Sequence, residues 1–253
     1  MKIQEVIDAL EQFAPLPLQE SYDNAGLQIG LTEADVSGAL LCLDVTEDVI
    51  DEAVRRGCNL VVSHHPLLFR GLKRISGGDY VQRTVVKAIK NDVCVVSMHT
   101  NLDNAEGGVN YKIAELLGLR DVTPLADGGS GAIGILAEPV EPIVLIQRVK
   151  DLFGVECCRT NALLERPVSR IALCGGAGSF LLGKALEQGA DAFITGEMHY
   201  HEYFGVEQQI QIMVIGHYES EQYTTDVLRR IMTERFPDIR TEMYGSTNPV
   251  RYW

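Results

Sequence analysis

The sequence predicts an α/β fold in which helices flank largely parallel strands. Two observations favour this class: short apolar runs alternate with stretches of helical periodicity, and a strand–helix–strand order occurs in both halves of the chain. A third observation indicates where the functional site lies. All six histidines lie in four short segments, and each segment follows an apolar run that is typical of a buried strand. Strand ends are where an α/β protein holds a rigid site facing solvent.

The first element is predicted to be a helix. Apolar residues have helical spacing from Ile3 to Phe13, and Pro15 and Pro17 end the pattern. A polar, turn-rich loop follows at residues 21–26.

A strand–helix–strand unit comes next. Residues 39–43 are a continuous apolar run, Thr46 has the character of a helix N-cap, and Gly57 closes the helix. Residues 60–62 return as a strand that leads directly into His64.

The same signals predict the later elements. They are a helix at 80–91, a strand at 93–98, a helix from Gly107-Gly108 to Gly118, a helix from Pro142, a strand at 171–173, a helix ending at Gly189, strands at 192–195 and 210–215, and a helix at 222–236. A polar, Gly-rich stretch at 123–131 suggests a boundary. We expect one domain of residues 1–125 plus about 210–253, and a second of residues 126–209.

The two halves contain a weak internal repeat at an offset of 132 positions. The pairs it aligns are Cys42 with Cys174, Ala53 with Ala185, Gly57 with Gly189, and Ser63 with Thr195. Chance could produce this number of matches, but the shared order of elements favours a duplicated motif.

Composition limits the function. The formal net charge is −13, and no Lys/Arg cluster is longer than a pair, which disfavours binding to duplex nucleic acid. We found neither a signal peptide nor a run of about 18 apolar residues, so we expect a soluble, cytoplasmic protein with no membrane partner. The six cysteines form no Cys-x-x-Cys pair, so a disulfide framework is not expected.

Imidazoles and carboxylates at strand ends are a ligand set for transition metals. His64 and His65 are adjacent, so on extended backbone they would point apart and serve two ions, or one ion and an orienting contact. His217 and Glu221 stand at i and i+4 and would stack on one helix face. Ordinary buried histidines and a carboxylate near a helix N-terminus are the alternatives for these two pairs.

Asp103 is a further candidate ligand, and His99 is expected to orient a ligand or a water molecule. Glu197, His199 and His201 share one face if their backbone is extended. They could be metal ligands, substrate contacts or proton carriers. Five ligands (His64, His65, Asp103, His217 and Glu221) are too many for one four-coordinate zinc, so we expect two divalent ions. The ion could be Zn, Fe, Mn, Co or Ni.

A glycine loop at residues 175–179 leads into a helix. Its backbone N–H groups could hold an anion, but it lacks the Lys of a P-loop, and a structural turn explains it equally well.

Six motifs together resemble one family, the NGG-interacting-factor-three-like proteins, also known as GTP cyclohydrolase I type 2 homologues. The motifs are Tyr22-Asp23-Asn24-Ala25-Gly26-Leu27-Gln28, Ser63-His64-His65-Pro66, His99-Thr100-Asn101-Leu102-Asp103, Cys174-Gly175-Gly176-Ala177-Gly178-Ser179, Ile194-Thr195-Gly196-Glu197-Met198-His199 and Gly216-His217-Tyr218-Glu219-Ser220-Glu221.

The resemblance implies two intertwined α/β domains with a duplicated motif and mixed sheets flanked by helices, assembled as a ring-shaped homohexamer. It also implies a dinuclear metal site on His64, His65, Asp103, His217 and Glu221. Tyr22 departs from the family, in which many members have Trp at that position.

Two functions fit these observations. The first is a metal-dependent hydrolase that acts on a small molecule, with GTP as the substrate that the family name implies. Glu197, His199 or His201 would then move protons. The second is a non-catalytic hexamer that buffers or delivers metal, or that serves as a scaffold for partners.

Overall fold

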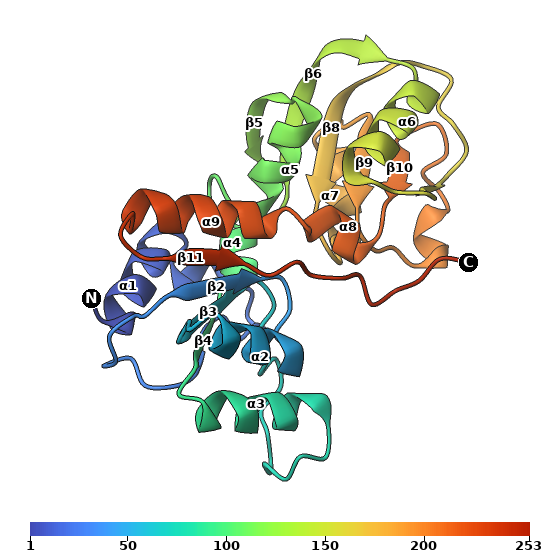
Figure 1. The fold of residues 1–253 in the computed structure, drawn as a ribbon. Helices are drawn as coiled ribbons and strands as arrows, with labels where there is room; N and C mark the ends of the chain where they lie inside the picture. Colours follow the sequence, from blue (N-terminus) through green and yellow to red (C-terminus); the bar gives the residue numbers. More distant parts are fainter. The chain divides into compact units, whose positions relative to one another are not determined.

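A computed structural model describes all residues from 1 to 253 and confirms the α/β class (Figure 1). The chain divides into two compact units. Unit 1 comprises Met1–Ala105 and Thr224–Pro249, and unit 2 comprises Glu106–Tyr223 and Val250–Trp253. These divisions fall after Ala105 and Tyr223, whereas the sequence placed them near residues 125 and 210. No helix is both long enough and apolar enough to span a membrane.

Unit 1 is built around one sheet. Its elements are α1 (Ile3–Phe13), η1 (Leu16–Leu18), β1 (Gly26–Ile29), β2 (Ala39–Cys42), α2 (Glu47–Arg55), β3 (Leu60–Ser63), α3 (Tyr80–Lys90), β4 (Cys94–Ser97), α4 (Thr100–Asp103), α9 (Thr224–Arg235) and β11 (Thr241–Met243). The strand order is β1-β4-β3-β2-β11, with β4, β3, β2 and β11 parallel and β1 antiparallel at one edge.

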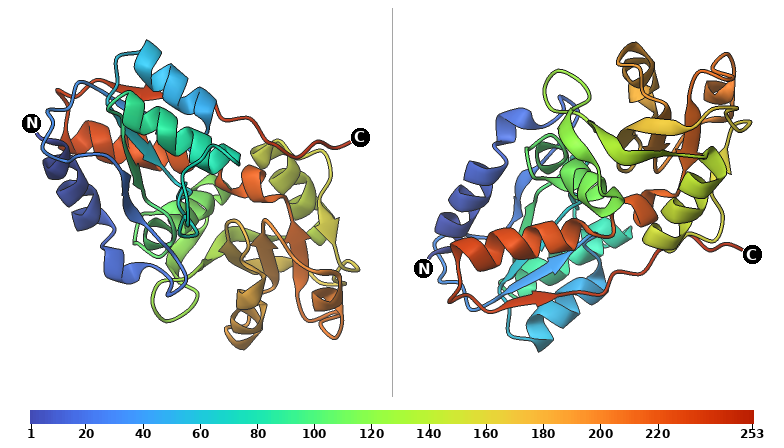
Figure 2. Two further views of the ribbon diagram at one scale, coloured as in Figure 1. Left: turned by 90° about the horizontal axis from the view of Figure 1, so that it is seen from below. Right: turned by 90° about the horizontal axis from the view of Figure 1, so that it is seen from above.

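Helices cover both faces of this sheet (Figures 1 and 2). Helices α2 and α3 pack on one face, and α1 and α9 lie on the other. Every residue of β2, β3 and β4 is therefore buried. This burial explains why these strands are continuous apolar runs in the sequence rather than alternating patterns.

Unit 2 contains the second sheet. Its elements are α5 (Val109–Leu117), β5 (Arg120–Pro124), β6 (Ala132–Val140), α6 (Pro142–Phe153), β7 (Arg159–Thr160), β8 (Val168–Cys174), η2 (Ser179–Leu181), α7 (Leu182–Glu187), β9 (Ala192–Thr195), η3 (Tyr200–Tyr203), β10 (Gln211–Val214) and α8 (His217–Glu221). The strand order is β5-β6-β8-β9-β10-β7, and β8, β9 and β10 are parallel.

The strand pairing confirms the internal repeat. Cys42 pairs with Ser63 across β2 and β3, and Cys174 pairs with Thr195 across β8 and β9. Both residues of the second pair lie 132 positions after their counterparts in the first. The two β–α–β motifs therefore share one register as well as one order of elements.

Local sequence signals fixed most helix ends. Thr46 caps α2 by accepting a hydrogen bond from the Val49 N–H, and Gly118 ends α5 in the left-handed conformation.

The antiparallel strands β1, β5, β6 and β7 and the short strand β11 were not predicted. The condition for Glu197, His199 and His201 to share one face, an extended backbone, is not met, because residues 200–203 form the 3-10 helix η3.

Candidate metal centre

In each unit, two adjacent parallel strands lead into the polar residues of the candidate site. In unit 1, β3 leads into His64 and His65, and its neighbour β4 leads through Met98 into His99. In unit 2, β9 leads into Glu197, and its neighbour β10 leads into His217. Parallel neighbours end at the same edge of a sheet, so each pair of strands brings its polar residues together.

The backbone at His64 and His65 bends instead of staying extended. The two ring centroids lie 4.7 Å apart, and each ring lies within 5.5 Å of the His99 ring. The expectation that the adjacent side chains point apart is therefore wrong. Ser63 and Ser97 hold the bend, because their hydroxyls donate to the carbonyls of His65 and His64 at 2.9 and 2.7 Å.

His64 is fully buried, and its surroundings fix which ring nitrogen carries the proton. Nδ1 lies 2.8 Å from the Met98 carbonyl oxygen, which can only accept, so Nδ1 donates. In the neutral ring Nε2 then keeps its lone pair. Nε2 lies 3.7 Å from Oδ1 of Asp103.

His65 and His99 follow the same pattern with carboxylate acceptors. Nδ1 of His65 lies 2.8 Å from Oδ1 of Asp44, and Nδ1 of His99 lies 2.7 Å from Oδ1 of Asp23. Burial alone would raise the pKa of Asp23, but hydrogen bonds from His99 and Thr100 outweigh it and lower the pKa to about 2. Asp23 is therefore a charged acceptor that orients His99.

These three imidazoles converge. One possible ligand atom from each of His64, His65 and His99 lies within 4.8 Å of the others. Two nitrogens on one zinc are separated by at most about 4.2 Å, twice the usual bond length, and paired ions lie about 3.5–4 Å apart. A donor set of neutral imidazoles with their Nδ1 atoms held by oxygen acceptors fits divalent metal binding.

Helix α4 positions Asp103 beside this cluster. Asn101, which is fully buried, anchors the helix by donating from Nδ2 to the Ala14 carbonyl at 2.7 Å. Its Oδ1 accepts a hydrogen bond from the His99 N–H at 2.9 Å. One buried amide thus ties the start of this segment, at His99, to Ala14 at the end of α1.

Unit 2 holds a second set of metal-ligand side chains. Nε2 of His217 lies 3.1 Å from Oε2 of Glu221, as their i, i+4 spacing on α8 predicts. Nδ1 of His217 lies 2.8 Å from Oε1 of Glu197. Glu197 therefore holds Nδ1 of His217 in the same way as Asp44 holds Nδ1 of His65. The Glu221 carboxylate is almost completely buried.

The glycine loop at 175–179 is a structural support rather than an open anion site. Side-chain oxygens already accept from three of its N–H groups: Asn110 from Gly175, Ser220 from Gly176, and Thr195 from Gly178. Glycine at position 176 leaves room for Glu221, because a Cβ there would lie 2.3 Å from its Oε1 and would displace the carboxylate. The loop thus holds α8 and leaves room for its carboxylate.

Glu219 packs against Gly216, at the turn that begins α8. It is buried, and a Cβ on Gly216 would lie 2.0 Å from its Oε2 and 3.1 Å from the Tyr252 hydroxyl. Burial and the hydrogen bond to Glu219 both raise the pKa of Tyr252.

His199 and His201 lie in a different environment from His217. His199 caps η3, its backbone N–H donating to Glu202 at 2.6 Å. The exposed His201 ring lies 5.2 Å from the Tyr200 ring and 6.3 Å from the Phe204 ring. Their proposed roles in proton transfer stay predictions.

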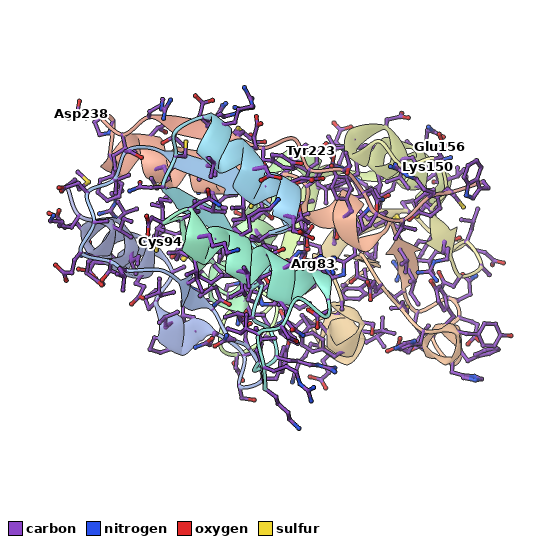
Figure 3. The ribbon with its side chains drawn as sticks, turned by 60° about the horizontal axis from the view of Figure 1, so that its bottom comes forward. Arg83, Cys94, Lys150, Glu156, Tyr223 and Asp238 are labelled. Atoms are coloured by element: carbon purple, nitrogen blue, oxygen red, sulfur yellow. The ribbon has the colours of Figure 1, made fainter.

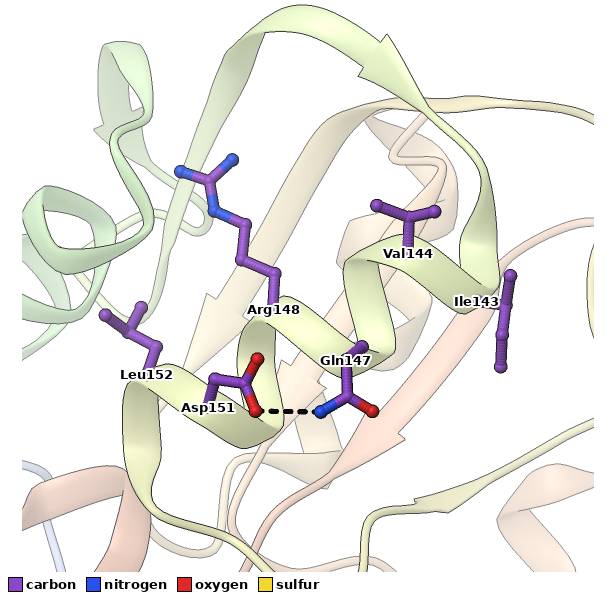
Figure 4. Close-up of a pocket in the computed structure, with 6 residues that line it drawn as sticks. All are labelled: Ile143, Val144, Gln147, Arg148, Asp151 and Leu152. Carbon is purple, nitrogen blue, oxygen red and sulfur yellow. Dashed lines mark hydrogen bonds between the residues drawn. The ribbon is translucent and has the colours of Figure 1, made fainter.

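A surface depression in unit 2 lies along α6 (Figure 4) and has no metal-ligand character. It is lined by Ile143, Val144, Gln147, Arg148, Asp151 and Leu152. Its polar groups already have partners: Gln147 donates to Asp151 at 2.7 Å, and Arg148 donates to the Leu117 carbonyl at 2.6 Å.

The roles of Asp44 and Asp23 were not predicted from the sequence. The contact between Asp44 and His65 could have been predicted from the pairing of β2 with β3. Cys42 pairs with Ser63, and Asp44 and His65 each come two positions later, at the same edge of the sheet. The structure thus brings His64, His65, His99 and Asp103 together in unit 1, and His217 with Glu197 and Glu221 in unit 2. A shared pair of ions for both sets stays a prediction.

Comparisons with known proteins agree with this picture. The family model of Duf34/NIF3 (NGG1p interacting factor 3) matches residues 1–249. A Clostridium perfringens protein named GTP cyclohydrolase 1 type 2 homolog is 36% identical over 228 residues, which cover 87% of each chain. A Schizosaccharomyces pombe protein named NIF3 homolog is 30% identical over 93% of this chain and 89% of its own length.

Solved structures share the fold. The crystal structure of a Staphylococcus aureus hypothetical protein has a TM-score of 0.91 and 25% identity, covering 100% of this chain and 99% of that one. A Bacillus cereus protein related to NIF3 has a TM-score of 0.90 at 24% identity, with the same coverage. The match along nearly the whole sequence, together with the shared fold, shows that the chain belongs to the Duf34/NIF3 family.

Proposed function

We propose that this protein binds divalent metal ions and hydrolyses a phosphorylated small molecule, with a nucleotide as the substrate class. One observation carries the proposal. His64, His65, His99 and His217 all have Nδ1 within 2.8 Å of an oxygen acceptor, which leaves each Nε2 as a potential metal ligand. The name GTP cyclohydrolase 1 type 2 homolog, carried by several relatives, supports a nucleotide.

The residues that would hold metal are His64, His65 and Asp103 in unit 1, and His217 and Glu221 in unit 2. Divalent ions held there would supply Lewis acidity toward a water molecule and toward developing negative charge. Asp44 and Glu197 would orient the imidazoles and increase their basicity through the bonds to Nδ1. The bend at His64 and the turn at Gly216 would keep the ligand atoms fixed on the strand ends.

One observation favours a second function, in which the protein holds or delivers metal without turnover. The carboxylates nearest the imidazoles are already engaged: Asp23 with His99, Asp44 with His65, and Glu197 with His217. A general base must be able to reach the proton that it removes. A metal carrier needs the fixed imidazoles but no such base.

The two functions differ in turnover. We would load wild-type protein with Zn²⁺, Mn²⁺, Co²⁺, Ni²⁺ or Fe²⁺ and assay GTP, other nucleotides and phosphoesters, with His64→Ala as the ligand variant. Lys90→Ala, an exposed change on α3, is the control. The hydrolase predicts turnover by wild type and the control, and its loss in His64→Ala. Bound metal without turnover of any substrate would leave only the carrier.

A further inference from the structure

The segment between His65 and α3 carries an isolated positive charge. Residues 66–78 contain Arg70, Lys73 and Arg74 and no acidic residue, in a chain whose net charge is −13. All three side chains are exposed, and none forms an ion pair. On α3, by contrast, Arg83, which is labelled in Figure 3, pairs with Glu47 at 2.8 Å, and Lys87 pairs with an aspartate at 2.6 Å.

Two exposed aromatic rings lie beside the same segment. The Phe69 ring is 6.1 Å from the His99 ring and 6.4 Å from the Tyr22 ring, edge to face in both cases. Tyr22 is 62% exposed and Phe69 is 43% exposed. The rings therefore extend the imidazole cluster toward solvent and leave aromatic surface available to a ligand.

The start of the segment is anchored to the sheet of unit 1. Asn24 donates to the Leu68 carbonyl at 2.8 Å, and Gln28 on β1 accepts from the Leu68 N–H at 3.1 Å. Phe69 and Arg70 follow this anchor directly, and the Phe69 ring lies 6.1 Å from the His99 ring. Beyond them, Leu72 and Ile75 line a pocket against β1 and α3.

We propose that Tyr22, Phe69, Arg70, Lys73 and Arg74 form the recognition site for a nucleotide at the imidazole cluster. A base would stack on the exposed aromatic rings, since stacking on such rings tolerates any base. The phosphates would be bound by the three cations, with Arg able to bind two oxygens at once. This local charge explains how an acidic protein attracts a polyanion.

The inference rests on the proposed function for the reaction, but its binding test stands separately. We would titrate wild type, with and without Zn²⁺, with GTP, guanosine and inorganic tripolyphosphate. The test variant is Arg70→Ala/Lys73→Ala/Arg74→Ala. The control, Lys90→Ala/Arg229→Ala/Arg235→Ala, removes the same charge from exposed positions that also lack ion pairs.

The site predicts that the test variant loses about tenfold or more in affinity for GTP and tripolyphosphate, while its affinity for guanosine and its metal content stay unchanged. The control should bind all three ligands as wild type does. Tyr22→Leu/Phe69→Leu should weaken guanosine and GTP binding but not tripolyphosphate binding.

Equal losses in the test and control variants would show a general charge effect and overturn the site. So would a test variant that binds GTP like wild type, or a wild type that binds none of the three ligands. Failure of the proposed function would look different, because wild type would then hold no metal, or hold metal without turnover, while the effect of the three cations on tripolyphosphate binding persisted.

Discussion

At the residue scale, the protonation of each imidazole decides what the site can do. Oxygen acceptors hold Nδ1 of His64, His65, His99 and His217. Three of these acceptors are carboxylates, and one is a backbone carbonyl. Each therefore fixes the tautomer and the ring orientation before any ligand binds.

Asp44 gives the simplest test of this arrangement. Asp44→Ala removes the acceptor from His65 without removing a proposed ligand, so metal affinity should fall by about 10–100-fold. A competition titration with a zinc chelator measures the change. Asp48→Ala, an exposed change in the first turn of α2, should bind metal as wild type does. Equal affinity of wild type and Asp44→Ala would contradict the orienting role.

Asp23 predicts a pH dependence of stability. Its pKa is about 2 in the folded protein, below the ordinary value of about 3.9. The folded state thus favours the charged form, and this stabilisation is full above about pH 4 and is lost as the pH falls through about 2. Metal-free Asp23→Asn should be less stable than wild type by about 1–2 kcal/mol near neutrality.

Urea unfolding of both proteins at a series of pH values measures this difference. The two free energies of unfolding should approach each other between pH ~4 and ~2, as Asp23 takes up its proton. A difference that stays constant to the lowest pH would show that the charge on Asp23 does not contribute.

The residue types of the site could be predicted from sequence, but their arrangement only in part. Spacing on a helix identified His217 with Glu221 because i and i+4 positions always stack. The bend at His64 and His65 could not be predicted, because it depends on the hydroxyls of Ser63 and Ser97, which come from two strands. The orienting role of Asp23 likewise depends on a contact 76 positions away.

At the element scale, the support of α8 by the glycine loop is the main finding. The loop follows β8, and Gly176 lies against His217 and Glu221 of α8. Ser220 ties the two together, accepting from the Gly176 N–H at 2.9 Å and donating to the His217 carbonyl at 2.8 Å. The loop therefore determines where the helix presents its carboxylate.

Gly176→Ala should displace this carboxylate. Its Cβ would lie 2.3 Å from Oε1 of Glu221, and φ at this position is +59°, which costs about 1–2 kcal/mol for a residue with a side chain. We expect lower stability and weaker metal binding, measured by thermal unfolding and zinc titration. Gly183→Ala in α7 meets no atom within 4 Å and should bind metal normally. Unchanged zinc binding by Gly176→Ala would contradict this account.

The elements that were predicted and those that were missed differ in what stabilises them. The two β–α–β motifs have continuous apolar strands, and Thr46 caps the helix of the first motif, so local signals identify them. Strand β11 has no fully buried residue, and it pairs with β2 although some 200 positions separate them in the sequence. Such a strand is defined by its partner rather than by its own residues.

At the scale of the whole molecule, the predicted metals would offset part of a large negative charge. A formal charge of −13 destabilises a compact state through self-repulsion, and Asp103 and Glu221 of the proposed site are part of that charge. Divalent ions bound to the folded state alone would therefore contribute to stability as well as to chemistry.

Removing metal should lower the stability of the protein. An ion present at about 100 times its dissociation constant adds about 2.7 kcal/mol to the free energy of unfolding. The melting temperature should thus fall when a chelator is added to zinc-loaded wild type, and recover with excess Zn²⁺. His64→Ala serves as the comparison, because the chelator should change its melting temperature much less. An equal fall in both proteins would show that the chelator acts elsewhere.

The most direct test of the central claim is the metal content of the purified protein after incubation with Zn²⁺ and removal of free ions. We predict two bound divalent ions per chain in wild type, and a loss of bound metal in both His64→Ala and His217→Ala, with each variant shown to be folded by circular dichroism. Wild-type protein without bound metal, or variants that retain the full amount, would contradict the claim.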